Sequence, residues 1–417
     1  MKVKCSTILK WLIELMIIMK LGFVKLLGSL IPIFASPYDT YPECILYLLL
    51  TIICVLFAFF IYREKASIYL RIELVVALVT IFCGIIHALN WNNMGFMDVL
   101  SSAMPYFYLM LSYPAYVLIK RKYWDIEDFF NFIIFWGTIA YFLKIVNCVS
   151  WLFTGKVIWQ NLISNSNWIL NNSLRINPPF VGLLIIPISY YKMSSEAKIR
   201  KKIKYLIPIV VSIAYSAFVH QARSIFLYQI ITLVAMYIFE HVTNRKKIVR
   251  YIVLIIAVVI VINTSYFENY INSFSPDNSV SGESTIARFN AIATFGNMYI
   301  KHPFWGMGFI EESKKNVGSV GAGLGHLDDI GVLGSFFTLG IPLLLLMILI
   351  LGRTLYLIYK MQEIHKGYSL LLIGMAVLLI MTGINISWFN GIYAFGIPFY
   401  ICILEYSRYH IKQSRDT

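Results

Sequence analysis

Two arginines and one histidine followed by aspartates are the side chains of this sequence that could do chemistry. Arg223 lies in the run His-Gln-Ala-Arg-Ser at residues 220–224, and Arg288 lies in a later segment with few other charges. The planar guanidinium group of arginine forms paired hydrogen bonds with phosphate oxygens, so two such groups could hold a diphosphate. The alternative for each arginine is a contact with lipid headgroups or an ion pair with a nearby acid.

His326 follows a glycine-rich run at 318–325 and precedes Asp328 and Asp329. A neutral imidazole, whose unperturbed pKa is about 6.5, can accept a proton from an attacking hydroxyl group. A nearby carboxylate such as Asp328 could orient the ring. The alternatives are a solvated loop histidine and a metal site formed with both aspartates, although adjacent acids are a weak signal for metal. We therefore expect no metal at this position.

The elements that must position these residues are membrane helices. The 417 residues are 59% hydrophobic and only 13% charged, with a mean hydropathy of +0.73. Soluble domains contain about 25% charged residues. Several stretches of roughly 17 to 23 residues carry almost no charge, which is the length that crosses a bilayer core of about 30 Å. The composition therefore predicts an all-α polytopic membrane protein.

Length and hydropathy predict about twelve transmembrane helices. Their expected ranges are 8–33, 44–62, 72–90, 97–119, 129–152, 176–192, 205–221, 224–240, 250–265, 331–351, 368–386 and 391–405. This assignment divides the chain into membrane helices at 1–265, an extracytoplasmic loop at 266–330, and membrane helices with a cytoplasmic tail at 331–417.

The net charge of +14 could suggest a nucleic-acid partner, but the positions of the basic residues argue against one. With the N-terminus inside, every internal segment is basic, including the expected internal loop 352–367 with Arg353, as the positive-inside rule predicts. We therefore expect a lipid bilayer and no nucleic acid as partner. Lys144, within the span expected at 129–152, is interpreted as extending to the outer membrane surface.

The segment 266–330 is too long to be a simple connection. Ser284 is expected to cap a helix within it, because apolar residues then recur at every third or fourth position. These residues are Ile286, Phe289, Ile292, Phe295 and Tyr299. The predicted amphipathic helix ends near His302 and Pro303, where His302 is interpreted as structural.

The order of these features resembles the superfamily of O-antigen ligases and of O-antigen and capsule repeat-unit polymerases, which are bacterial envelope glycosyltransferases. The likeness covers about 130 residues, from 220 to 350. The matching features are the turn Gln221-Ala-Arg223-Ser224, Arg288 on a helix, the run Lys301-His-Pro-Phe-Trp-Gly-Met-Gly-Phe309, and His326 before a helix with Gly331, Gly334, Gly340 and Pro342. Many members have Asn directly after the histidine, where this chain has Leu327 and then Asp328, as in an acidic variant associated with capsule and exopolysaccharide polymerases.

The resemblance implies a helical bundle of the membrane glycosyltransferase C type in the bacterial cytoplasmic membrane, with its active site on the extracytoplasmic face. It implies a donor glycan on undecaprenyl diphosphate, so that no cofactor and no metal is needed. Arg223 and Arg288 would bind the diphosphate, and His326 would activate the acceptor hydroxyl with Asp328 as its orienting group. A single displacement predicts inversion of configuration. A flippase and a chain-length regulator are the protein partners that such an enzyme would have.

We favour a polymerase over a ligase because of the pair Asp328–Asp329. The alternative from a different class is a transporter, such as a flippase for lipid-linked oligosaccharides. Transporters often contain repeated halves and charges at mid-membrane, and we find no such halves in this sequence. A third alternative is a scaffold subunit of an envelope assembly complex, in which His326 would have no chemical role.

Overall fold

The computed structural model describes residues 4–27, 31–34, 36, 40–162, 169–170, 173–240, 248–252, 256, 263–264, 268, 272, 282–317, 325–389 and 393–416. Helices make up most of this part of the chain. They are α1 (Cys5–Lys20), α2 (Tyr41–Phe57), α3 (Ile68–Asn90), α4 (Phe96–Phe107), α5 (Ser112–Lys120), α6 (Ile126–Thr154), α7 (Ile185–Ser195), α8 (Ile199–Ala214), α9 (Arg223–Phe239), α12 (Gly282–Tyr299), α13 (Val332–Ile364), α14 (Lys366–Asn385) and α15 (Ile397–Asp416).

Short elements connect and extend these helices. Two π-helical turns, Ala58–Tyr62 and Tyr215–His220, continue α2 and α8. The 3-10 turns are Phe23–Leu27, Pro32–Phe34, Tyr108–Leu111, Gln160–Leu162, Phe180–Leu183, Glu312–Lys315, Leu327–Ile330 and Ala394–Gly396. Two antiparallel pairs of two-residue strands complete the described elements: β1 (Ile169–Leu170) with β2 (Ser173–Leu174), and β3 (Asn316–Val317) with β4 (Gly325–His326).

Six helical stretches among the described residues are long and apolar enough to cross a membrane. They are Tyr41–Tyr62, Ile68–Asn90, Ile126–Thr154, Ile199–His220, Val332–Ile364 and Lys366–Asn385. The prediction of a helical membrane protein is confirmed at this level. The total of about twelve spans stays a prediction, and most of the span expected at 250–265 lies outside the described residues.

The outer helices expose apolar side chains, as expected for helices in contact with lipid. Only 28% of the most apolar window of α2 is buried, against 72% for α14. The exposed side chains of this stretch include Leu49, Ile52 and Leu56 of α2 and Phe59 of the π-helical turn that continues it. Since contiguous exposed apolar surface of this extent is rare on soluble monomers, the α2 face is suited to a bilayer.

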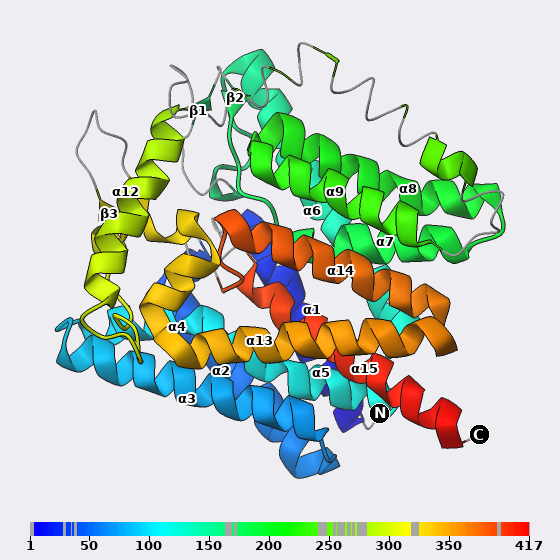
Figure 1. Cartoon of the computed structure of the whole chain (residues 1–417), viewed down its shortest axis with the longest axis horizontal. Coiled ribbons are helices and arrows are strands. Elements are labelled where there is room, and N and C mark those ends of the chain that lie inside the picture. Colours follow the sequence, from blue (N-terminus) through cyan, green and yellow to red (C-terminus); the bar gives the residue numbers. More distant parts are fainter. Residues whose placement is uncertain are drawn as a thin grey trace.

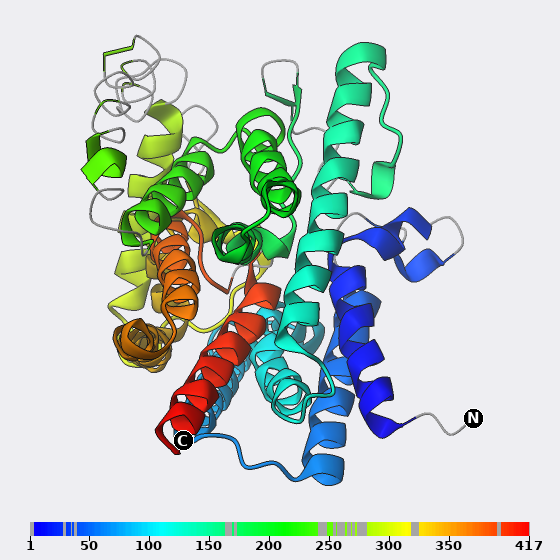
Figure 2. The same cartoon turned by 90° about the vertical axis from the view of Figure 1, so that its right-hand side faces the viewer.

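The helices run mostly along the long axis of the molecule, which is horizontal in Figure 1. α13 packs against α14 on one side and α3 on the other, and α14 also packs against α9. α12 and β3 lie at one end of the long axis, while both termini lie toward the other end (Figure 1). Figure 2 shows α6 alongside the group formed by α7, α8 and α9.

The boundaries expected for the first span and for the span at 331–351 are wrong. α1 ends at Lys20, because Gly22 adopts a φ of +94° and the chain turns there. α13 instead continues to Ile364, through the segment expected to be an internal loop. A charge inside a helix ends a hydropathy window, but it does not end the helix when an opposite charge from a neighbouring helix pairs with it.

Arg353 is that charge. Its guanidinium group donates to Glu73 of α3 at 2.7 Å and to Glu405 of α15 at 2.5 Å. All three side chains are almost fully buried, with at most 3% of each exposed. The three residues, called here the buried triad, therefore join α3, α13 and α15 through one arginine.

The segment Phe304–Gly308 crosses α13 where that helix is broken at Gly340. Gly340 has a φ of +63°, and a Cβ atom there would lie 2.3 Å from the Phe304 carbonyl oxygen. The two segments share three backbone hydrogen bonds, from Met307 N–H to Phe337 O (2.8 Å), from Gly308 N–H to Thr338 O (2.8 Å) and from Ile341 N–H to Phe304 O (2.9 Å). Glycine is needed at such a contact because any side chain would separate the two backbones.

The helix predicted in the long loop is confirmed as α12, but two details of its prediction are wrong. It begins at Gly282, so Ser284 lies inside the helix and is not its cap. Its buried side chains are Ala287, Ala291 and Phe295, while Ile286 and Phe289 are exposed. The small alanines were not counted as apolar anchors, yet they allow α12 to approach Leu327, Ile330 and Phe337 closely.

Candidate functional site

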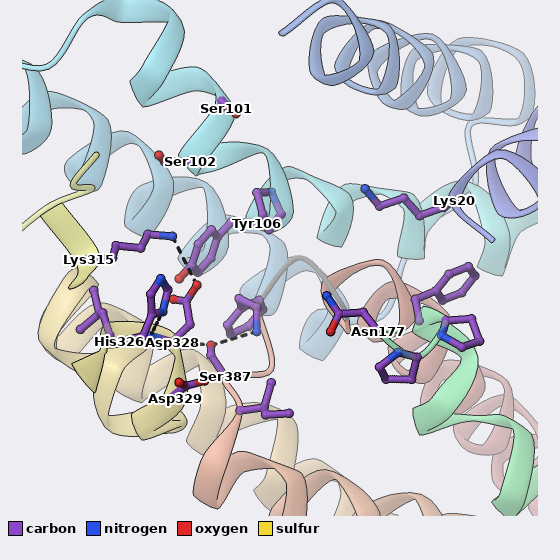
Figure 3. A pocket seen from close by; sticks show the side chains of 18 of the residues that line it. Lys20, Ser101, Ser102, Tyr106, Asn177, Lys315, His326, Asp328, Asp329 and Ser387 are labelled. Carbon is purple, nitrogen blue, oxygen red and sulfur yellow. Dashed lines mark hydrogen bonds and ion pairs between the residues drawn. The ribbon is translucent and has the colours of Figure 1, made fainter. Parts of the chain in front are cut away.

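Most of the predicted site residues line one cavity, which has a volume of about 1290 Å³ (Figure 3). Arg288, His326, Asp328 and Asp329 line it. Arg223 does not line the cavity itself, but its two chain neighbours Ala222 and Ser224 do. α1, α2, α4, α6, α9, α12, α13 and α14, together with the chain between them, supply the remaining walls.

Backbone pairing and apolar contacts on both sides fix the position of His326. In the strand pair β3–β4, His326 is the partner of Asn316. The following turn, Leu327–Ile330, buries its first and last side chains against α12 and α13. The imidazole is therefore held between a strand pair and a packed turn, in the loop that the sequence predicted. Most of the glycine-rich run before it lies outside the described residues.

The His326 ring is oriented by a backbone group. Its Nδ1 atom accepts the N–H of Asp328 at 3.2 Å, which caps the turn Leu327–Ile330. An accepting Nδ1 holds a lone pair, so a neutral ring in this arrangement carries its proton on Nε2. His326 can therefore donate a hydrogen bond from Nε2, and its basic lone pair is already used by the cap.

The Asp328 carboxylate forms an ion pair with Lys315, at 3.3 Å (Figure 3). Asp328 thus contacts His326 through its backbone N–H, while its side chain is directed toward Lys315. The predicted pairing of the two residues is present, but the contacting atom differs from the expected carboxylate. The role of Asp328 in orienting the ring stays a prediction.

Asp329 faces the cavity and lies near several cationic groups. Burial raises the pKa of its carboxyl group. The positive charge of His326 when its ring is protonated, and the charges of Arg288 and Arg175, act against this rise, and the charge of Asp328 adds to it. A carboxyl group with a raised pKa takes up a proton more readily than an ordinary one, as general bases require.

Arg288 extends from α12 into the cavity. Its Nε atom is buried and has no hydrogen-bond partner among the described residues. A buried donor without a partner costs roughly 1–3 kcal/mol, which an anion bound at this point would offset. Arg288 is therefore well placed to bind an oxyanion.

Arg223 is the first residue of α9, directly after a tight turn in which Gln221 has a φ of +53°. The N-terminus of a helix carries a partial positive charge, and Arg223 adds a full charge at the same place. Ser224, in the same first turn, lines the cavity. The arrangement favours an anion at this end of α9.

Arg175 belongs to this group, and sequence analysis did not single it out. Its Nε–H donates to the His220 carbonyl oxygen at 2.9 Å. Burial lowers the pKa of Arg175, the Asp329 carboxylate opposes this, and the nearby Arg223 charge adds to it. Arg175 is therefore hydrogen-bonded to the end of the π-helical turn Tyr215–His220 and lies near the Asp329 charge. The available signal was an arginine next to Asn177-Pro-Pro, whose prolines restrict the chain.

The interpretation of Lys144 as a residue that extends to the outer membrane surface stays a prediction. Its Nζ atom donates to the Asn177 carbonyl oxygen at 2.7 Å and lines the cavity. Lys20 and Lys25, from the expected first span, line the same cavity because the chain turns at Gly22. Hydropathy places a lysine at a depth in the membrane but gives no direction around the helix.

His302 packs against aromatic rings, and the structural role expected for it stays a prediction. Its ring lies against Trp91, with centroids 3.8 Å apart, and against His87 at 4.9 Å. In the part of the chain that the structure describes, no group of three or more His, Cys, Asp and Glu side chains is arranged to hold a metal ion.

No protein-family model matches this chain, and no curated protein matches it. The chemical interpretation of the cavity therefore rests on its own residues. Arginines and a helix N-terminus can hold an anionic leaving group, while Asp329 and His326 can exchange a proton with a neighbouring hydroxyl. Together these groups are suited to a group-transfer reaction in which an anionic group leaves the donor and a neutral nucleophile takes its place.

Proposed function

We propose that the protein is a polymerase that joins oligosaccharide repeat units carried on undecaprenyl diphosphate into a capsule, exopolysaccharide or O-antigen chain. It would act in the bacterial cytoplasmic membrane, with the cavity open to the extracytoplasmic face. The observation that supports this most is the meeting of Arg175, Arg288, His326 and Asp329 in one cavity. Anion-binding groups and proton acceptors are then available to one bound substrate pair.

The proposed reaction is a single displacement at the anomeric carbon of the donor. The acceptor hydroxyl oxygen forms the new glycosidic bond, while the bond from the anomeric carbon to the diphosphate oxygen breaks. The diphosphate leaves with the bonding electrons, and Arg288 with Arg223 and Arg175 stabilises its charge. The hydroxyl proton passes to a base in the cavity, and the configuration at the anomeric carbon inverts.

His326 and Asp329 are both candidates for that base. His326 must release its cap contact with the Asp328 N–H before its lone pair can take a proton. Asp329 already presents its carboxylate to the cavity. We therefore assign proton acceptance to Asp329 in the capped conformation, with His326 donating a hydrogen bond from Nε2 to the acceptor or the diphosphate.

The experiment that tests the proposal is complementation of a strain that lacks this gene. The strain receives wild type, His326→Ala or Arg288→Gln, with membrane levels matched, and surface polysaccharide is separated by length. Wild type is expected to restore long polymer, and both variants are expected to leave single repeat units. Arg200→Gln, which removes an exposed arginine far from the cavity lining, is the matched control and should restore polymer.

The same gel separates the alternatives. A ligase would leave full-length polymer on the lipid carrier when inactive, because its role is transfer to the lipid A core. A flippase would cause loss of all extracytoplasmic repeat units. Full polymer from both the His326 and the Arg288 variants would contradict the enzymatic proposal and would favour a scaffold.

A further inference from the structure

A second set of cations lines the end of the cavity opposite His326. Lys20 and Asn177 lie on the far side of the view from Lys315, His326 and Asp328 (Figure 3). Lys25 and Lys144 line the cavity together with Lys20. These three lysines are called here the lysine end.

Each lysine is held by a different element and a different kind of contact. Lys144 of α6 donates to a backbone carbonyl, that of Asn177. Lys20 of α1 lies over the rings of Tyr47 and Tyr108, 4.9 and 5.5 Å from their centroids. Lys25 donates to the Ser36 carbonyl oxygen at 3.2 Å and pairs with Glu43 at 3.5 Å. Such contacts fix three ammonium groups in place.

Lys144 lies close to a second positive charge. Lys25 pairs with Glu43 and adds to the positive potential at Lys144. Within the described residues, Lys144 forms no ion pair. An ammonium group away from bulk water and beside a second ammonium is unfavourable unless an anion is close. Lys144 is therefore electrostatically complementary to an anionic ligand.

The cavity is large enough for two bound groups at its two ends. Sites for small ligands have volumes of about 300–1,000 Å³, and this cavity measures about 1290 Å³. Arg288 and Asp329 occupy the His326 end with one anion-binding group and one base candidate. An extended saccharide that reaches from that end could place a second charged group among the lysines.

We propose that the lysine end is a second anion-binding subsite, which holds a carboxylate or phosphate group of the saccharide substrate away from His326. The subsite rests on the proposed function for the identity of its ligand as a saccharide. Its anionic group could belong to an acidic sugar of the repeat unit or to the lipid diphosphate of the second reactant. Both sources share the chemistry that lysine recognises, which is a compact oxyanion.

Binding to purified full-length protein in lipid nanodiscs tests the subsite. The probes are glucuronate and inorganic pyrophosphate, with glucose as the uncharged control, and affinity is measured by calorimetry. Lys144→Gln is expected to weaken binding of at least one anionic probe about tenfold, which corresponds to about 1.4 kcal/mol. Lys144→Arg should retain binding, and Lys156→Gln, which removes an exposed lysine outside the cavity lining, should match wild type.

The two probes distinguish the two sources. Loss of glucuronate binding in Lys144→Gln, with pyrophosphate binding sensitive to Arg288→Gln instead, supports an acidic sugar. Loss of pyrophosphate binding in Lys144→Gln supports a lipid diphosphate. Unchanged affinity for both probes in Lys144→Gln, or no binding of either probe to wild type, overturns the subsite. Lys20→Gln provides a second variant if Lys144→Gln does not fold.

This measurement is independent of the proposed reaction, because no lipid-linked substrate and no polymer formation is involved. A protein that lacks polymerase activity in the complementation gel could still bind the probes through the lysine end. Equally, a polymerase whose Lys144 has no effect on either probe would keep its proposed function and lose the subsite.

Discussion

Asp329 is a cavity residue whose protonation depends on its surroundings. Because burial raises its folded-state pKa above the ordinary value of 3.8, the protonated form favours folding. This contribution is fully present below pH 3.8 and is lost as the pH rises through the folded-state value. At neutral pH we therefore expect the carboxylate to lower stability, by a small amount because Asp329 is exposed to solvent in the cavity.

Asp329→Asn should accordingly raise the melting temperature at pH 7. The gain should shrink as the pH falls and disappear near pH 3.8, because both side chains are then uncharged. Thermal unfolding of wild type and variant in the same detergent, measured from about pH 3 to about pH 8 in steps of about one pH unit, the scale of such shifts, tests this. Equal melting temperatures at pH 7 would contradict the raised pKa.

The Asp329 and His326 variants should also differ in catalysis. Loss of a general base lowers rates by roughly 10²–10⁴-fold, whereas loss of one hydrogen-bond donor has a smaller effect when the base remains. Asp329→Asn should therefore slow polymerisation of purified lipid-linked repeat units more than His326→Gln does. Asp128→Asn, an exposed aspartate on α6, is the control. The reverse order would assign the base to His326 and require it to leave its cap.

Among the elements, the break in α13 fixes the position of the part of that helix that lines the cavity. The contact between Phe304–Gly308 and Gly340 anchors the chain after α12 onto the helix that follows His326. The run Lys301–Phe309, which contributes to the family resemblance, thus has a structural task in this chain. It holds the segment after α12 and the helix α13, which precede and follow the loop containing His326, at a fixed separation.

Gly340→Ala should destabilise the protein by more than about 2 kcal/mol, because it combines a left-handed backbone with a side-chain clash. Gly352→Ala is a matched control on the same helix, since a Cβ atom there meets nothing within 4 Å. The control should be neutral or stabilising by up to about 1 kcal/mol. Chemical unfolding in detergent micelles measures both; an equal effect of the two substitutions would contradict the anchoring role of Gly340.

The buried triad predicts a second stability effect between elements. Arg353→Met leaves Glu73 and Glu405 without their cation, and removal of one partner from a buried ion pair costs about 3–5 kcal/mol. The triple variant Glu73→Gln, Arg353→Met, Glu405→Gln should recover much of this loss because no charge stays buried. Melting temperatures of the single and triple variants provide the comparison, and a triple variant as unstable as Arg353→Met alone would argue against an electrostatic cause.

For the whole molecule, orientation in the membrane is the property that decides whether the cavity meets extracytoplasmic substrates. In a cysteine-free background, Lys301→Cys should react with an impermeant maleimide added to intact cells, because it follows α12 and is exposed. Arg200→Cys, at the start of α8, should react only after the membrane is permeabilised. Labelling of Arg200→Cys in intact cells would reverse the predicted topology.

Sequence patterns predicted the helical membrane class of the chain, and four of the residues they singled out, Arg288, His326, Asp328 and Asp329, line one cavity. Helices lie near most of the positions that hydropathy predicted. Arg288 and His326, which the sequence placed in one long loop, line the same cavity. What hydropathy could not predict was direction around a helix axis or contact between distant segments. For that reason only the three-dimensional structure revealed the contacts of Arg175, of Lys144 and of the triad partners of Arg353.

The separation of the triad along the chain has a consequence for biosynthesis. Glu73 and Arg353 lie 280 residues apart, and Glu405 is made later still. At ribosomal rates of about 5–20 residues per second, roughly 14 to 56 s pass between the synthesis of Glu73 and that of Arg353. During that time an acid-bearing helix sits in or beside the bilayer without its cation. We therefore expect nascent chains arrested before residue 353, in which α3 lacks its arginine, to be selective targets of membrane quality-control proteases.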